Sequence, residues 1–95
     1  MKIPKSVRVG RKKYTVRKVN NVAKLGHISY KDAVIEVSRR YFSGKPRSQY
    51  SQSETFWHEL THGILKDMDN PLFNDEKFVS AFAARLNAAV HSAEF

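Results

Sequence analysis

The hydrophobic pattern of this 95-residue chain changes its period near the middle, and that change sets the fold class. In residues 1–50, apolar and polar side chains alternate over short runs, which is typical of half-buried strands. In residues 51–95, apolar side chains recur at helical spacing, which is typical of amphipathic helices. The sequence therefore predicts a single α+β domain, residues 1–95, with the coarse order β-β-β-β-α-α.

Four short runs in the first half are predicted to form two strand pairs. The first pair is Ser6–Val9 with Tyr14–Val19, joined by a hairpin loop at Gly10–Lys13. The second pair is His27–Tyr30 with Ala33–Ser38. Basic residues alternate with the apolar ones in the first pair, so we expect the outer face of the sheet to be basic.

The second half is predicted to form two helices. Arg39–Tyr50 contains glycine and proline and is expected to be a flexible connection to them. Ser51 and Glu54 match a capping box, so the first helix is expected to begin with Ser51 as its N-cap. Asp67–Pro71 should end that helix, and Asn74 should cap the second one. The second helix has an apolar stripe made by Phe78, Val79, Phe82, Ala83, Leu86 and Val90.

The charge of the chain is distributed unevenly between the two halves. Residues 1–50 carry 14 Lys or Arg and 2 Asp or Glu, a balance of +12, whereas residues 51–95 carry 3 and 7, a balance of −4. A basic half is compatible with a surface for nucleic acid or for an acidic partner. A solvated sheet face that only increases solubility is the simpler interpretation, because no recognised nucleic-acid motif accompanies the charge.

The composition restricts the kind of metal site that the chain could form. It has no cysteine, which excludes a disulfide framework and a thiolate metal site, so any metal must be bound by histidine, carboxylate and water. Met1–Lys5 lacks the apolar segment of a signal peptide, and no run approaches the length of a membrane span. We therefore expect a soluble cytoplasmic protein without a membrane partner.

The strongest candidate for chemistry is the pentapeptide His58-Glu59-Leu60-Thr61-His62, which has the pattern HExxH. Residues four apart lie one turn above each other on a helix, so His58 and His62 would share one face. Two imidazoles placed in this way can bind one zinc ion, and the glutamate between them can face the water bound to the metal. The pattern predicts a zinc site with Glu59 as general base.

A catalytic zinc site needs a third protein ligand, and Glu76 is the best candidate. It lies at the start of the second predicted helix, on the face that also carries apolar residues, where a carboxylate is costly unless a cation partners it. Asp75 is the alternative ligand, and His27 and His91 are weaker ones. Glu76 could also act only as a favourable charge at the helix start.

The donor that would stabilise a tetrahedral intermediate is left open by the sequence. Four residues could donate a hydrogen bond to an oxyanion: Tyr30, Tyr41, Tyr50 and His91.

Gly63, directly after the second histidine of the motif, lowers helix propensity, which predicts a packing role against a strand or the second helix.

Across Ser53–Val90 the chain resembles gluzincin-type zinc metallopeptidases, more closely the minigluzincins and short metallopeptidase-like proteins encoded by phages and prophages. The resemblance rests on Glu54–Leu65 and Asn74–Val79, while Gly26-His27-Ile28 and the strand Ala33–Ser38 fit more loosely. It implies a minimal zincin-like fold, in which a small, mostly antiparallel sheet packs on an active-site helix and a following glutamate helix. It also implies that an extended peptide pairs with an edge strand beside the zinc, here Ala33–Ser38.

The expected function is that of a zinc-dependent peptidase, which hydrolyses a peptide bond of a peptide or protein substrate with metal-activated water. The alternative is a phage-type binding protein with a structural or vestigial zinc site, whose basic half docks an acidic partner or nucleic acid. If the chain is phage-encoded, the expected location is the cytoplasm of a bacterial host.

Overall fold

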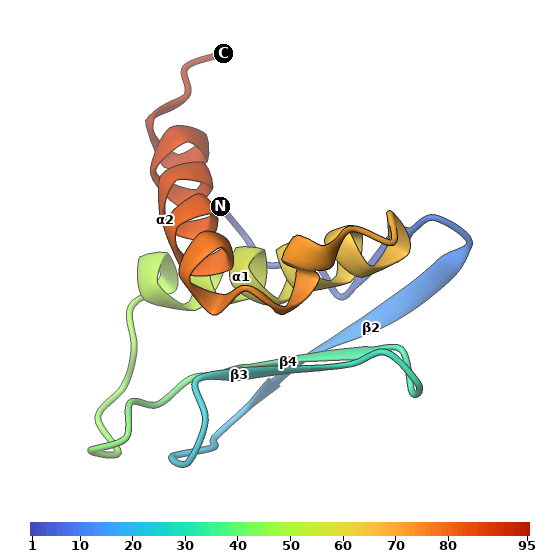
Figure 1. The fold of residues 1–95 in the computed structure, drawn as a ribbon. Coiled ribbons are helices and arrows are strands. Elements are labelled where there is room, and N and C mark those ends of the chain that lie inside the picture. The colour runs from blue at the N-terminus through green and yellow to red at the C-terminus, as the bar shows by residue number, and fades with distance from the viewer.

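A computed structural model describes the whole chain, residues 1–95, and shows a sheet with two helices layered on one side of it (Figure 1). The strands are β1 (Ser6–Val9), β2 (Lys12–Val19), β3 (Gly26–Ser29) and β4 (Val34–Ser38). The helices are α1 (Gln49–Asp67), the short 3₁₀ helix η1 (Pro71–Asn74) and α2 (Glu76–Ser92). The α+β class predicted from the sequence is confirmed.

The four strands form one mixed sheet in the order β1-β2-β4-β3. The two predicted hairpins, β1–β2 and β3–β4, are antiparallel, whereas β2 and β4 run parallel. β4 therefore lies inside the sheet, and the prediction that Ala33–Ser38 forms its exposed edge is wrong. The edge strands are β1 and β3. The central position suits β4, because Ile35 and Val37 are completely buried there.

Alternation along the strands separates a buried face from a solvent-exposed face, as predicted. The residues that face the helices form the core together with residues of α1: Ile3, Val9, Tyr14, Ile35, Val37, Phe56 and Leu60. On the other face, Arg8, Thr15 and Arg17 are exposed, which gives the sheet its basic outer surface. Lys12 and Lys13 belong to β2, so the loop of the first hairpin is shorter than predicted.

Both helices begin at different caps from those that the sequence suggested. Ser48, and not Ser51, is the N-cap of α1, and its side chain accepts a hydrogen bond from the Ser51 backbone N–H at 3.1 Å. Asp75, and not Asn74, is the N-cap of α2, because Asn74 is taken up by η1. The Asp75 carboxylate accepts a hydrogen bond from the Phe78 N–H at 3.0 Å.

The connection between β4 and α1, which was expected to be flexible, is anchored by the buried side chain of Arg47. Its guanidinium donates to the backbone carbonyls of Leu25, Ser38 and Ser51, at 3.1, 2.9 and 2.9 Å. It also donates to the hydroxyls of Ser51 and Thr55. One side chain thus joins the segment before β3, the end of β4 and the first turns of α1.

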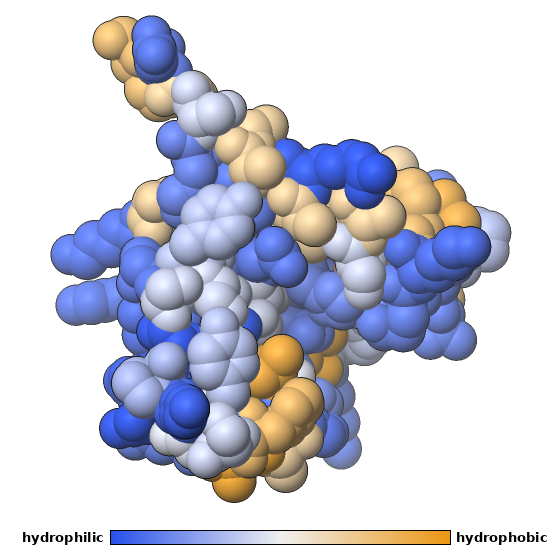
Figure 2. Space-filling view, turned by 90° about the vertical axis from the view of Figure 1, so that its left-hand side faces the viewer, coloured by the Kyte–Doolittle hydropathy of each residue, from blue (hydrophilic) through white to orange (hydrophobic).

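The surface at the end of the molecule where α1 begins is mostly hydrophilic, with hydrophobic residues gathered in separate patches (Figure 2). A small apolar groove lies between α1 and α2, and its rim includes the exposed side chains of Ile64, Met68 and Phe82. None of the helices combines the length and the apolar character needed to cross a bilayer.

Candidate metal centre

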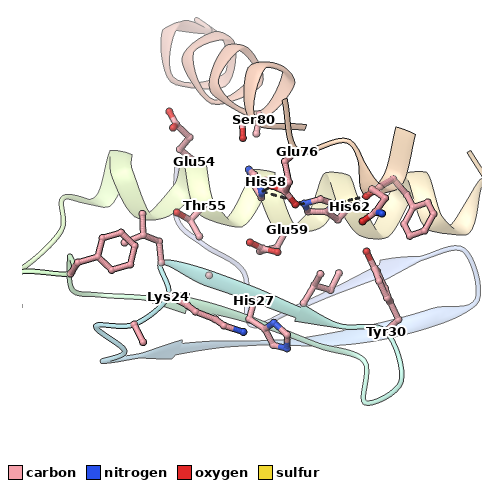
Figure 3. A pocket seen from close by; sticks show the side chains of 18 residues that line it. Lys24, His27, Tyr30, Glu54, Thr55, His58, Glu59, His62, Glu76 and Ser80 are labelled. Carbon is pink, nitrogen blue, oxygen red and sulfur yellow. Dashed lines mark hydrogen bonds and ion pairs between the residues drawn. The ribbon is translucent and has the colours of Figure 1, made fainter. Parts of the chain in front are cut away.

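Two elements supply the residues of the candidate metal centre. His58 and His62 lie one turn apart in α1, and Glu76 is the first residue of α2. η1 reverses the chain between the two helices, and its Phe73 carbonyl contacts His62. Figure 3 shows the Glu76 carboxylate between the two imidazoles. The structure therefore brings together the three residues that the sequence analysis proposed as ligands.

The distances between these three side chains are those expected for ligands of one shared metal ion. Glu76 Oε1 lies 2.8 Å from His62 Nε2, Glu76 Oε2 lies 3.1 Å from His58 Nε2, and the two Nε2 atoms are 3.2 Å apart. Ligands placed at about 2.0–2.1 Å from a tetrahedral zinc ion would be separated from one another by roughly 3.3 Å. The three side chains could therefore bind one metal ion with little movement.

The hydrogen bond of His62 prepares its ring for metal binding. His62 Nδ1 donates to the Phe73 carbonyl at 2.6 Å, which leaves the lone pair of Nε2 directed toward Glu76 and His58. For His58, burial lowers the pKa, and the neighbouring His62 lowers it further, while Glu76 opposes the shift. Neutral imidazoles are the form that binds a metal, so this environment favours ligation.

The alternative ligands lie elsewhere or have another role. The Asp75 side chain caps α2 and does not join the group. His91 lies near the other end of α2, where its Nδ1 donates to the Asn87 carbonyl at 2.8 Å. His27 is in β3 and lines the same cleft, yet it is not among the three clustered residues.

Glu59 points from α1 into the space between that helix and β3, beside the three clustered residues (Figure 3). Its side chain accepts no hydrogen bond and forms no ion pair in the structure. Burial raises the pKa of Glu59 to about 7; nearby His62 opposes this shift and Glu76 adds to it. A carboxylate that is buried beside a candidate metal group and makes no structural contact is free to exchange a proton with water or with a substrate.

The candidate metal centre opens into a cleft of ≈ 720 Å³ between α1, α2 and β3. Of the four predicted oxyanion donors, only Tyr30 lines this cleft. Burial raises the pKa of Tyr30, and the charges of Tyr14, Glu59 and Glu76 raise it further, so its hydroxyl stays protonated. Tyr50 packs on the His91 ring instead, and Tyr41 lies against Arg47.

Two glycines let the sheet approach α1 closely at this cleft. A Cβ at Gly26 would overlap the Thr55 methyl group and lie 3.0 Å from Glu59 Oε2. A Cβ at Gly63 would lie 3.1 Å from Ile28 of β3, which confirms the predicted packing role of that glycine. The sequence analysis missed the role of Gly26, because a glycine at the start of a strand gives no indication of which side chain it faces.

Lys24 and Ser80 also line the cleft and were not predicted. Lys24 precedes β3, and its side chain lies on the same side of the cleft as His27 and extends toward it (Figure 3). Ser80 lies in α2, one turn beyond Glu76. Neither belongs to a recognisable motif, so only the folded arrangement identifies them.

The chain was compared with protein-family models, curated proteins and solved structures, and it matches none of them.

Proposed function

We propose that this chain is a zinc-dependent peptidase, in which His58, His62 and Glu76 hold the metal and Glu59 acts as general base. One observation carries the proposal. A buried carboxylate without a structural partner lies beside three side chains at metal-ligand spacing, within a cleft that is bordered by an edge strand. A purely structural metal site would require neither such a carboxylate nor an open cleft.

The donor set favours zinc. Two imidazoles and one carboxylate are a ligand set of catalytic zinc sites, and three protein ligands leave a fourth position for water or substrate. Zinc held there would activate a water molecule and polarise a substrate carbonyl. Glu59 would accept a proton from the attacking water on its carboxylate and would then transfer it to the leaving amine.

The substrate would be an extended peptide that pairs with β3. β3 is the edge strand on the side of the cleft, and Gly26, His27 and Ile28 of this strand line it. The outer edge of β3 offers unpaired N–H and C=O groups, to which a peptide backbone can add as a further strand. Ala33–Ser38 cannot bind the peptide in this way, because β4 is enclosed by β2 and β3.

Tyr30 is the proposed donor to the developing oxyanion. Its hydroxyl points toward the side of the cleft that holds His62 (Figure 3). We expect Tyr30→Phe to lower kcat by about 10- to 100-fold, because loss of one donor to an oxyanion typically has an effect of this order or larger. Zinc content should not change, since Tyr30 is outside the ligand group.

The decisive experiment compares Glu59→Gln with the wild type. Zinc-loaded protein is incubated with a degenerate peptide library, cleavage is followed by mass spectrometry, and zinc is measured by atomic emission. The variant should keep one zinc per chain and lose about 10²- to 10⁴-fold in rate, as expected for removal of a general base. Glu54→Gln is a matched control, because Glu54 also lines the cleft, one turn earlier in α1.

Two results would contradict the proposal. Cleavage by Glu59→Gln at the wild-type rate would remove Glu59 from the reaction. Zinc binding by a wild-type protein that cleaves no peptide would favour the other candidate, a binding protein with a structural metal.

A further inference from the structure

We infer that the protein has a second, separate binding site, a basic pocket that takes the phosphate groups of a ligand. The pocket measures ≈ 620 Å³ and is formed by the N-terminal segment, β2, the end of β4 and the start of α1. Nine residues line it: Met1, Lys2, Ile3, Pro4, Lys5, Val16, Lys18, Arg39 and Gln49. Four of the nine have cationic side chains and none has an acidic one. The pocket shares no residue with the metal cleft.

Two of the cations, Lys18 and Arg39, continue the rows of inward-facing residues that form the core on β2 and β4. In β2, Lys18 continues the row of Tyr14 and Val16 that faces α1. Arg39 follows the same spacing after Ile35 and Val37 of β4. Because β2 and β4 are parallel and in register, the two rows end at the same end of the sheet. Apolar residues thus give way to a pair of neighbouring cations where the hydrophobic core ends.

Hydrogen bonds to the backbone of the N-terminal segment bring the other two cations to this place. The Val16 N–H donates to the Lys5 carbonyl at 2.9 Å, which fixes the N-terminal segment along β2. Gln49 Nε2 donates to the Met1 carbonyl at 2.9 Å, and Lys18 Nζ donates to Gln49 Oε1 at 3.5 Å. Lys2 and Lys5 are therefore held at the rim of the pocket by ordered structure.

The four positive charges have no acidic partner in the protein. The ion pairs of the structure are confined to His58, His62 and Glu76, none of which lines this pocket. Like charges gathered in one hollow repel each other, and an anion placed among them removes that repulsion while accepting hydrogen bonds from each. Phosphate offers several acceptor oxygens and more than one charge, and the volume is that of a typical small-ligand site.

The shared chemistry is phosphate, which can come from a soluble phosphorylated compound or from the backbone of a nucleic acid. Two probes distinguish these sources: pyrophosphate, and a short single-stranded oligonucleotide. Each is titrated into the 95-residue protein at low ionic strength, and binding is followed by calorimetry and by backbone amide chemical shifts. Shift changes centred on Lys5, Lys18 and Gln49 are expected for at least one probe.

The test variant is Lys18→Gln/Arg39→Gln, and its matched control is Lys31→Gln/Lys45→Gln. Both pairs remove two exposed positive charges, but Lys31 and Lys45 lie outside the pocket. The test variant should bind the probe at least about tenfold more weakly, the effect of losing charged hydrogen bonds. The control should stay within about twofold of the wild type, since distant exposed charges are screened.

Equal weakening in both variants would overturn the inference, because it would reduce the effect to net charge. Absence of binding by either probe at low ionic strength would overturn it as well. Binding of pyrophosphate alone assigns the pocket to a soluble phosphorylated ligand, and binding of the oligonucleotide alone assigns it to nucleic acid. The shift map of the wild type keeps the inference testable if the double variant unfolds.

Discussion

At the scale of single residues, the candidate metal centre depends on two contacts that the protein makes without a metal ion. The Phe73 carbonyl takes the Nδ1 proton of His62, which fixes the tautomer and orients the ring. Glu76 is placed by the cap that Asp75 forms at the start of α2. Neither contact is part of the HExxH pattern, yet each one decides where a ligand atom lies.

Removal of the ligand side chains should remove the metal. Protein purified without chelator is expected to carry about one zinc per chain, and His58→Ala or His62→Ala should abolish this stoichiometry. Glu76→Ala should weaken zinc binding strongly, because two ligands hold zinc poorly. The measurement is zinc content by atomic emission, with His91→Ala as the histidine control outside the group. Full zinc occupancy in Glu76→Ala would exclude that residue as a ligand.

Among the polar residues, Arg47 is the one whose substitution should lower the free energy of unfolding most. Arg47→Met would remove the guanidinium that donates to the carbonyls of Leu25, Ser38 and Ser51. We expect the free energy of unfolding to fall by roughly 2–4 kcal/mol, measured by urea denaturation. Arg85→Met is the control, because Arg85 is exposed on α2 and should change stability by less than about 0.5 kcal/mol.

At the scale of elements, the sequence predicted which segments form strands and helices but not how the strands are ordered. Alternation in Val34–Ser38 indicates one buried face, and it reads the same in a central strand as in an edge strand. Only the contacts made after folding place β4 between β2 and β3. The helix starts were missed for a related reason, since several polar residues near Ser48 and Asp75 could serve as caps.

The candidate ligands were easier to predict than the rest of the cleft. His58 and His62 follow from one local spacing, and Glu76 follows from the start of the next helix. Tyr30, Lys24 and Gly26 come from β3 and its flanks, which face α1 only because the sheet packs there. No local pattern encodes that contact, so the sequence left these residues undetermined or unnoticed.

The close approach of β3 to α1 can be tested at Gly26. A methyl group at Gly26 would overlap Thr55 and crowd Glu59, so Gly26→Ala must displace the strand or the helix. We expect a loss of about 1–3 kcal/mol in stability by urea denaturation, the usual range for overpacking. Peptide cleavage should fall as well, because β3 would move relative to Glu59.

Thr55→Ser provides the matched rescue for this variant. It removes the Thr55 methyl group that a Gly26 Cβ would meet, and it keeps the hydroxyl that accepts from Arg47. The double variant Gly26→Ala/Thr55→Ser should regain part of the lost stability. If the double variant is no more stable than Gly26→Ala, the overlap with Thr55 does not limit the approach of β3.

At the scale of the whole molecule, α2 is attached to α1 at two places of different character. Toward its C-terminal end, the completely buried Asn87 accepts from Ser53 Oγ at 2.7 Å and donates to the Tyr50 carbonyl at 3.1 Å. At its N-terminal end, Glu76 meets the two histidines of α1 across an open cleft. The first attachment is made by the protein alone, whereas at the second the three side chains could hold a metal ion between the helices.

Metal binding should therefore stabilise the molecule as a whole, and the effect should depend on Glu76. Because zinc would bind the folded chain through residues from both helices, a free concentration of one hundred times its dissociation constant adds about 2.7 kcal/mol of stability. For a domain of this size that corresponds to a rise of roughly 10–20 °C in Tm. Scanning calorimetry of chelator-treated protein, with and without added zinc, measures this shift. Glu76→Ala should lose most of it, while Glu94→Ala, which removes a carboxylate beyond the end of α2, should keep it in full. A zinc-dependent rise in Tm of the same size in Glu76→Ala would mean that the metal binds without joining the two helices.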